Sequence, residues 1–576
     1  MTSMCKDEEI LAPHYLILSP SQRYTSKQSV DFPKADPGSN LLPVALSPFW
    51  VLNVNLQAKF DPVELEARAA LDHHIMEDCS AKHLVLRTPE LISEILNHLA
   101  LPISTLHDLV DFKPAKGCAL RSSLLAAATC CRRFKEPALD ALWRTMDSFE
   151  PILNMLPIVN QDDFDLLQIQ DCTRTLWEKV ETYTARIRIF LYQRSLYLRL
   201  KDGMATHVSV FNAIVAHQQF LLPGLRVLLI PSCPPEFLQS ALYFVSPVLK
   251  HIEAGTNEST VFKPHELEMF VLTVSCRTDR LRHLSLFSTT VSLSPSALKA
   301  LPLHTVTLNN PPKDTLLALS SLPNLKELTV LYAHRSRLDN NALGGFLALD
   351  SLSLLADAGA ISQYLMACNG GLTRVRFNVI EGDGGQIKDL VDLMAKRLSQ
   401  SLRRLVVVLS KRVSLNGNFK LVDLFGPLFK IPLAYVHIGH HGSGTLTTSL
   451  LDIASKLPAV RHLSLPSSAP GDAPTLSDLY GLTQTHPNIS YLGTSLDVQD
   501  VLPLFLVHTQ HELDTLKVHN SPLLSTNVRP VALQLDRLFP YLRILQSDGP
   551  DSSKWKEVSD FLDICHLARR NLIVDV

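Results

Sequence analysis

A short pattern of hydrophobic positions, Leu-x-x-Leu-x-Leu with Val or Ile replacing some leucines, recurs from the middle of the chain to near its end. The copies begin at Leu225, Leu249, Leu281, Leu303, Leu325, Leu349, Leu372, Leu402, Leu433, Val460, Ile489, Leu513 and Leu542. Successive copies are about 22 to 32 residues apart, close to the roughly 20 to 29 residues of a strand-plus-helix leucine-rich repeat. The spacing predicts an irregular leucine-rich-repeat solenoid over 221–550. The alternative is a conventional α/β domain in which the Leu strings are accidental.

Apolar and polar positions alternate within each string, which is typical of a short strand with one buried side. Helix-like stretches such as 341–347, 385–399 and 447–457 lie between strings, and Leu-Pro or His-Pro steps often end them. The predicted fold class is therefore α/β, with parallel strands on one face of the solenoid and helices on the other. The outward residues that we expect to bind a target protein are His283, Ser285, Arg374, Arg376, His462 and Ser464.

The residues before the repeats predict first disorder and then helices. Residues 1–60 mix Ser, Pro and Lys with few apolar patches, which is typical of a poorly ordered lead-in. Residues 61–83 contain good helix formers behind a capping Asp, so we expect a linker helix there.

Two further helical patterns follow the expected linker helix. In 86–101, Thr88 is placed as N-cap and Pro89 as the first helical residue, and the apolar residues share one face. In 120–143 the helical spacing runs up to a break at Pro137, after which a third short helix begins. Three short helices bury little core by themselves, so a partner or neighbouring domain should cover part of their apolar surface.

These helices carry a resemblance to a known family. The pattern runs Thr88-Pro89-Glu90-Leu91-Ile92, Ile95-Leu96, Leu99, then Leu125-Ala126, Cys130-Cys131-Arg132-Arg133-Phe134, Pro137-Ala138-Leu139 and Leu142-Trp143-Arg144. It resembles an F-box, particularly that of the F-box-like proteins abundant in mushroom-forming fungi. The resemblance implies that an F-box-like module over 84–145 docks on the adaptor subunit of an SCF-type cullin ubiquitin ligase.

The adaptor-binding residues that the resemblance implies are Pro89, Leu91, Ile92, Ile95, Leu96, Leu99, Leu125, Phe134, Leu142 and Trp143. The alternative interpretation of the same helices is a cap on the N-terminal end of the solenoid, which a repeat array needs for solubility.

The remaining segments connect and close the array. We expect connecting helices and the first repeat in 146–220, where the stretch from Trp177 is also similar to the segment that opens the repeat region in those F-box-like proteins. We expect a C-terminal capping helix over 551–576, in which apolar residues recur at helical spacing. These residues are Trp555, Val558, Phe561, Leu562 and Cys565.

Composition narrows the choice of partners. The 54 Lys and Arg residues against 56 Asp and Glu residues give a formal net charge of −2, which leaves no global field to hold a nucleic acid or an anionic membrane. The 10 cysteines include no C-x-x-C pair, which favours reduced thiols. No apolar run approaches the roughly 18 residues of a membrane helix, and charges interrupt the start of the chain. We therefore expect a cytoplasmic and/or nuclear protein that binds neither nucleic acid nor membrane.

Candidate catalytic and metal-binding motifs are weak. The neighbouring histidines His73-His74 and His440-His441 point their rings in different directions, and the Gly-rich stretch 439–444 lacks the Lys of a phosphate-binding loop. The acidic stretch 381–386 lacks the ordered Asp/Asn ladder of a calcium loop. We expect neither an enzyme nor a cofactor or metal.

The resulting hypothesis is a substrate-recognition subunit. It would bind the SCF adaptor, and through it a cullin, by the F-box-like helices, and it would bind a target protein by the solenoid. The alternative is a leucine-rich-repeat scaffold for protein interactions unconnected with ubiquitin.

Overall fold

Most of the described chain is built around a long parallel β-sheet. The computed structural model describes residues 88–99, 105, 114–161, 166–169, 173–192, 205–230, 235–255, 264–287, 291–333, 345–368, 371–415, 419–441, 446–447, 449–467, 472–499 and 509–574. The expected lead-in, 1–60, and linker helix, 61–83, lie outside these residues. The chain divides after Tyr192 into two units, a helical unit and a sheet unit.

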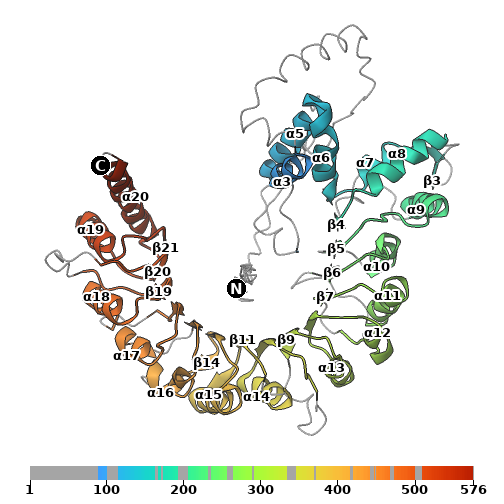
Figure 1. The fold of residues 1–576 in the computed structure, drawn as a ribbon. Helices are drawn as coiled ribbons and strands as arrows, with labels where there is room; N and C mark the ends of the chain where they lie inside the picture. Colours follow the sequence, from blue (N-terminus) through green and yellow to red (C-terminus); the bar gives the residue numbers. More distant parts are fainter. Residues whose placement is uncertain are drawn as a thin grey trace, which may run out of the picture. The chain divides into compact units, whose positions relative to one another are not determined.

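The helical unit contains most of the helices that precede the repeats (Figure 1). The elements up to Tyr192 are, in chain order, α3 (Pro89–Asn97), α5 (Pro114–Cys130), α6 (Arg132–Arg144), β1 (Thr145–Met146), α7 (Glu150–Leu153), β2 (Ile158–Gln161), β3 (Leu166–Ile169), α8 (Arg174–Thr184) and β4 (Ile189–Leu191). Helix α3 begins after Thr88, as its N-cap pattern predicts, and β1 pairs with β4 in parallel.

A small apolar cluster joins α3, α5 and α6. Its buried members are Ile92, Leu96, Leu124, Ala138 and Ala141. The expected break at Pro137 is wrong, because the chain leaves the helix at Cys131, whose backbone is extended (φ −156°, ψ 160°), and Pro137 lies inside α6. The helix boundary is therefore set by a local extended residue and not by the proline.

The sheet unit alternates strands with helices or short turns. Its helices are α9 (Ala205–Gln218), α10 (Pro235–Ala241), α11 (Pro264–Arg277), α12 (Pro295–Lys299), α13 (Lys313–Ser320), α14 (Ala358–Ala367), α15 (Gly384–Leu398), α16 (Leu421–Phe425), α17 (Leu450–Ser455), α18 (Leu476–Thr485), α19 (Val528–Leu538) and α20 (Ser552–Val574), with 3-10 turns at Leu242–Phe244, Leu428–Lys430 and Ser525–Asn527. We expected a helix over 341–347, of which the structure describes 345–347. These three residues are not helical, and Phe346 has a positive φ of 55°, which is incompatible with a right-handed helix.

Each Leu-x-x-Leu string supplies one strand of the main sheet. These strands are β5 (Val227–Ile230), β6 (His251–Ala254), β7 (His283–Leu286), β8 (Thr305–Asn309), β9 (Glu327–Ala333), β10 (Ser351–Ala356), β11 (Arg374–Val379), β13 (Arg404–Leu409), β16 (Tyr435–His440), β18 (His462–Ser464), β19 (Tyr491–Thr494), β20 (Thr515–His519) and β21 (Ile544–Asp548). They stand in the sheet in chain order. Short strands outside the main sheet pair in parallel as β12 (Gly382–Asp383) with β14 (Val413–Ser414) and β15 (Phe419–Lys420) with β17 (Leu446–Thr447).

The register explains why the leucines recur. The second residue of each strand pairs with the second residue of the next, so that Leu284 lies beside Val306 and Val306 beside Leu328. These side chains are buried and aligned from strand to strand, so they form a continuous column. Helices cover one face of the sheet (Figure 1). The long all-parallel sheet confirms the α/β fold with parallel strands and gives the unit a solenoid-like build.

The last helix closes the sheet unit. Trp555 of α20 is buried, and its indole N–H donates to the carbonyl oxygen of Ser521 at 3.0 Å. Val558 and Leu562 are also buried, whereas Phe561 is exposed and Cys565 half-buried. Among the described residues, no helix is long and apolar enough to cross a membrane.

Candidate functional site

Helix α3 presents two apolar side chains outward. Leu91 is 44% exposed and Ile95 is 49% exposed, whereas Ile92 and Leu96 point into the cluster of the helical unit and are nearly fully buried. Residues four apart lie one above the other on a helix, so Leu91 and Ile95 form one short apolar ridge. The sequence placed all four residues in one functional set, and the structure separates them into a buried pair and an exposed pair.

The other expected adaptor-binding residues are divided in the same way. Pro89 is exposed at the start of α3. Leu99, Phe134 and Leu142 are partly buried and pack against the cluster of the helical unit. Leu125 is half-buried on α5, and the ring of Trp143 lies 4.7 Å from that of Tyr183 on α8. Several of these side chains therefore contribute to the packing of the unit itself.

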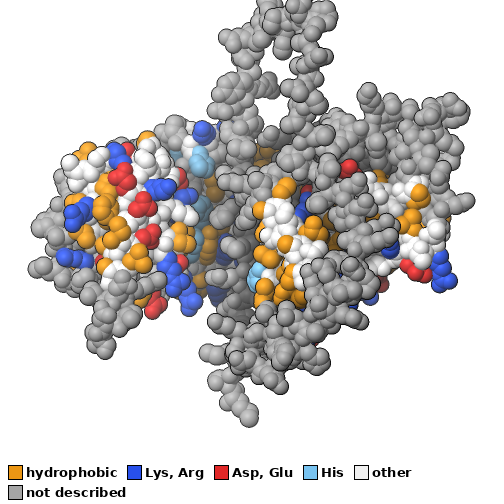
Figure 2. Space-filling model, turned by 90° about the horizontal axis from the view of Figure 1, so that it is seen from above, with side chains coloured by type: hydrophobic (Ala, Val, Ile, Leu, Met, Phe, Trp, Pro, Cys, Tyr) orange, Lys and Arg blue, Asp and Glu red, His pale blue; other side chains and the backbone are white. Residues whose placement is uncertain are grey.

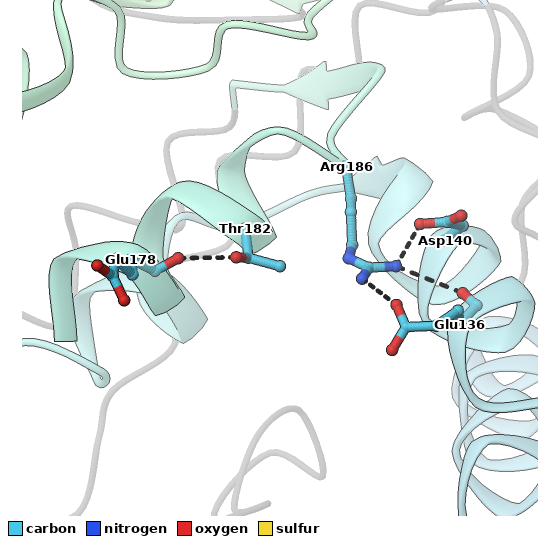
Figure 3. Close-up of polar contacts among 5 residues, drawn as sticks. All are labelled: Glu136, Asp140, Glu178, Thr182 and Arg186. Carbon is cyan, nitrogen blue, oxygen red and sulfur yellow. Dashed lines mark hydrogen bonds and ion pairs between the residues drawn. The ribbon is translucent and has the colours of Figure 1, made fainter. Parts of the chain in front are cut away.

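An arginine fixes α8 to α6. Arg186, in the turn after α8, donates to the carboxylates of Glu136 and Asp140, and its Nη1 also reaches the carbonyl oxygen of Glu136 at 3.4 Å (Figure 3). The Arg186 side chain is only 13% exposed, whereas the two carboxylates are largely exposed. The last turn of α8 carries a separate local bond, from the Thr182 hydroxyl to the carbonyl oxygen of Glu178 at 2.7 Å. The contacts of Arg186 hold the end of α8 against α6.

The expected target-binding residues stand in two rows on the outward face of the sheet. The first residue of each strand makes the outer row, which contains His283, Arg374 and His462. The third residue makes the inner row, which contains Ser285, Arg376 and Ser464. The structure thus brings these sequence-distant residues onto one face.

The six residues differ in what they can offer a partner. Arg374 Nη2 lies 2.8 Å from Glu327 Oε1 and 2.9 Å from Asp350 Oδ2, so much of its charge is balanced locally. Ser464 is only 1% exposed, because it is a short side chain in register with His437 and with the backbone of Gly493. A Cβ on Gly493 would stand 2.7 Å from the Ser464 Oγ, so any larger residue there would displace the Ser464 side chain.

A stack of rings runs along the outer row in the C-terminal part of the sheet. Tyr435 and His462 stack at a centroid distance of 3.8 Å, and His462 and Tyr491 stack at the same distance, with interplanar angles of 11° and 10°. The Arg404 guanidinium carbon lies 4.1 Å from the centroid of Tyr435 and extends the stack by one strand. We refer to these four residues as the aromatic stack.

Sequence reasoning found only His462 of this stack. The missed signal is an aromatic or basic residue at the first strand position in four consecutive strings. Figure 2 shows histidine side chains gathered on the strand side of the C-terminal part of the sheet unit. Burial, followed by the charge repulsion of Tyr435 and Asp548, raises the pKa of Tyr491 to about 12, so its hydroxyl keeps its proton and can donate a hydrogen bond.

The described residues contain no group of three or more His, Cys, Asp or Glu side chains that could hold a metal ion. The described cysteines form no disulfides. Burial raises the pKa of the Cys368 thiol to about 12, so the thiol keeps its proton.

Among the comparisons with known proteins, the one with solved structures found matches. No protein-family model matches the chain, and no curated protein matches it. Among solved structures, the chain is similar to one from the complex of Rad7 and Elc1 in yeast, with 13% identity over 80% of this chain and 94% of that chain, at a TM-score of 0.27. A TM-score this low does not establish a shared fold.

Proposed function

We propose that this chain is a non-enzymatic substrate-recognition subunit of an SCF-type cullin ubiquitin ligase, acting in the cytoplasm or nucleus. In this proposal α3, α5 and α6 are an F-box-like module that docks on the ligase adaptor. The sheet unit is an irregular leucine-rich-repeat solenoid whose outward face binds a target protein. The observation that carries the docking role is the exposed pair Leu91 and Ile95 on a helix whose opposite side is buried.

The exposed pair supports docking for a physical reason. Two large aliphatic side chains on adjacent turns cost solvation free energy in water, and a partner that covers their exposed halves recovers about half of the roughly 1.5 to 3 kcal/mol that full burial of such a side chain gives. The helix on which they stand is held by its own buried residues and needs no rearrangement to bind. Such an apolar ridge is suited to an adaptor groove that accepts an amphipathic helix.

The outward face of the sheet has the composition of a protein-binding surface. Tyr and Arg are enriched among residues that dominate binding energy, and the aromatic stack supplies two tyrosines, an arginine and a histidine in a preformed line. Preformed rings lose little conformational entropy on binding.

One observation favours the scaffold alternative. Leu99, Phe134 and Leu142 pack against the unit's own cluster, as the residues of a cap would. A scaffold unconnected with ubiquitin would need Leu91 and Ile95 only for contacts with another part of the chain or with an unrelated protein.

The test is capture of the adaptor and cullin from a lysate by the full chain and by two variants. Leu91→Ala with Ile95→Ala removes the ridge and should lower recovery of both proteins by at least about tenfold, since hot-spot truncations cost more than about 1 kcal/mol each. Glu94→Ala with His98→Ala, two exposed polar residues at the end of the same helix that pair with each other, should leave recovery unchanged. Failure of the unaltered chain to recover the adaptor would leave the scaffold as the better description.

A further inference from the structure

Basic residues occupy one register position in consecutive strands of the sheet unit. The residue just before each strand from β5 to β9 is Arg226, Lys250, Arg282, His304 and Lys326 in turn. We refer to these five residues as the basic ladder. It lies along the edge of the sheet at which the strands begin, and it contains none of the residues that the sequence pattern singled out.

The backbone fixes the spacing of the ladder. The Lys250 N–H donates to the carbonyl oxygen of Arg226 at 2.9 Å, and the Arg282 N–H donates to that of Lys250 at 2.9 Å. The His304 N–H donates to Arg282 at 2.8 Å, and the Lys326 N–H donates to His304 at 2.8 Å. Each residue is therefore hydrogen-bonded to the one before it, and the ladder advances by about 4.8 Å per strand.

The four Lys and Arg residues of the ladder are exposed. Among the residues that the structure describes, none of these four side chains makes an ion pair. Elsewhere on the same sheet two outward bases pair with carboxylates, Arg374 with Glu327 and Asp350, and Lys517 with Asp548. The ladder is thus a line of positive charge that the described part of the chain leaves unbalanced.

The positive charges of the ladder contribute to lowering the pKa of two histidines. Burial lowers the pKa of His304, and the charges of Arg282 and Lys326 lower it further. Burial also lowers the pKa of His283, the next residue after Arg282, to about 4, with His251, His304 and Arg282 adding to the effect. Repulsion among these groups is relieved by an anion placed along the edge.

We propose that the basic ladder binds an extended or helical acidic segment of a target protein, with successive carboxylates facing Arg226, Lys250, Arg282 and Lys326. This deepens the target-binding role proposed above by naming the chemistry of the target. Carboxylates on successive turns of a helix lie about 5 to 6 Å apart, close to the pitch of the ladder. The contact is independent of adaptor docking, because it needs only the sheet unit.

Several features favour an acidic protein segment over a nucleic acid. The ladder is one side chain wide, and the carboxylate of Glu327, 40% exposed, lies on the adjoining outer row, where a broad polyanion would meet it. Asp279 and Arg280, exposed before Arg282, cancel one another. No Tyr, Phe or Trp stands at the first or third position of β5 to β9 to stack with bases.

The experiment measures binding of fluorescent peptides to the full chain by anisotropy. The probes are a glutamate-rich peptide, a peptide of equal length with Gln in place of Glu, and single-stranded DNA of equal charge. The ladder variant replaces Arg226, Lys250, Arg282 and Lys326 by Gln. The matched control replaces four exposed bases on helices, Lys388, Lys396, Arg529 and Lys556, by Gln and so removes the same charge.

We expect the glutamate-rich peptide to bind the unaltered chain, the ladder variant to bind it at least about tenfold more weakly, and the control to stay within about twofold. The Gln peptide should not bind. Leu91→Ala with Ile95→Ala should bind the acidic peptide normally, so failure of adaptor docking and failure of the ladder are separable. An equal loss in ladder and control variants, the absence of peptide binding, or tighter binding of the DNA through the same four residues would overturn the proposal. Unchanged circular dichroism and Tm of the variants establish that a loss is not unfolding.

Discussion

The helical unit and the sheet unit bury their apolar residues in different ways. In the helical unit a small cluster forms in which Ile92 and Leu96 of α3 meet Leu124 of α5 and two alanines of α6. The sheet unit repeats one contact along the chain, so that Leu352 lies between Leu328 and Val375 in adjacent strands. A small cluster covers only one side of a helix and leaves Leu91 and Ile95 for a partner. A repeated column buries the inward strand residues of most repeats and leaves an outward face of polar and aromatic residues. In each unit, the way in which the apolar core is covered determines which side chains remain exposed for a partner.

The largest expected effect tests how far each core extends. Leu352→Ala should cost about 2 to 5 kcal/mol, because a fully buried Leu loses contacts on both strand neighbours. Ile92→Ala should cost somewhat less and act only on α3, α5 and α6. Hydrogen exchange measured by mass spectrometry should accelerate in β9 to β11 for the first variant and in the helical unit for the second.

Ser353→Ala, an outward neighbour of Leu352, is the control and should change local stability by under about 0.5 kcal/mol. Faster exchange in β9 to β11 on Ile92→Ala would contradict the separation of the two cores.

An intermediate effect concerns the arginine that braces the helical unit. Arg186→Met should cost about 1 to 2 kcal/mol, because a nearly buried guanidinium loses charge-assisted bonds to Glu136 and Asp140. Arg174→Met, in the same unit, should cost under about 0.5 kcal/mol, because its pair with Glu178 is exposed. Both are read from hydrogen exchange in α6 and α8. Equal effects would mean that Arg186 acts only as a surface charge.

The strands were predictable from the sequence because their cause is local and repeated. A strand begins two residues after the start of every Leu string, and the outward placement of His283 and Arg374 followed from simple alternation. The break at Cys131 was not predictable, since the local pattern marked Pro137 instead.

The exposed surfaces could not be predicted in the same way, because they depend on the register between neighbouring strands, and no single Leu string determines that register. The aromatic stack joins residues about one repeat apart, and only the parallel pairing of β13 to β19 brings their rings face to face. Ser464 alternates outward as expected but is covered by its neighbours, because alternation does not report the size of adjacent side chains. The exposure of Leu91 and burial of Ile92 likewise depend on where α5 and α6 pack.

The smallest expected effect is a dependence on pH in the sheet unit. The pKa of His283 is about 4 in the folded chain, below its ordinary value of 6.5, mainly because of burial. A depressed pKa means that the folded chain binds fewer protons than the unfolded chain, so stability is complete above about pH 6.5 and falls as the pH drops toward about 4. His283 is partly exposed, so solvent screening limits the loss to about 1 kcal/mol.

His283→Gln should flatten the dependence of urea denaturation on pH between about 6.5 and 4. Ser285→Ala, on the same strand and without a titrating group, should retain the slope of the unaltered chain. An unchanged slope in His283→Gln would show that the ring is accessible to protons in the folded chain.

The aromatic stack has an optical consequence. Parallel rings a few ångströms apart in a fixed arrangement couple their electronic transitions, and near-ultraviolet circular dichroism is sensitive to such fixed packing. Two of the stacked rings are tyrosines, on β16 and β19, so their shared signal depends on β16, β18 and β19 keeping their register. The near-ultraviolet circular dichroism of the stack therefore reports whether these strands keep their alignment on the face proposed to bind the target.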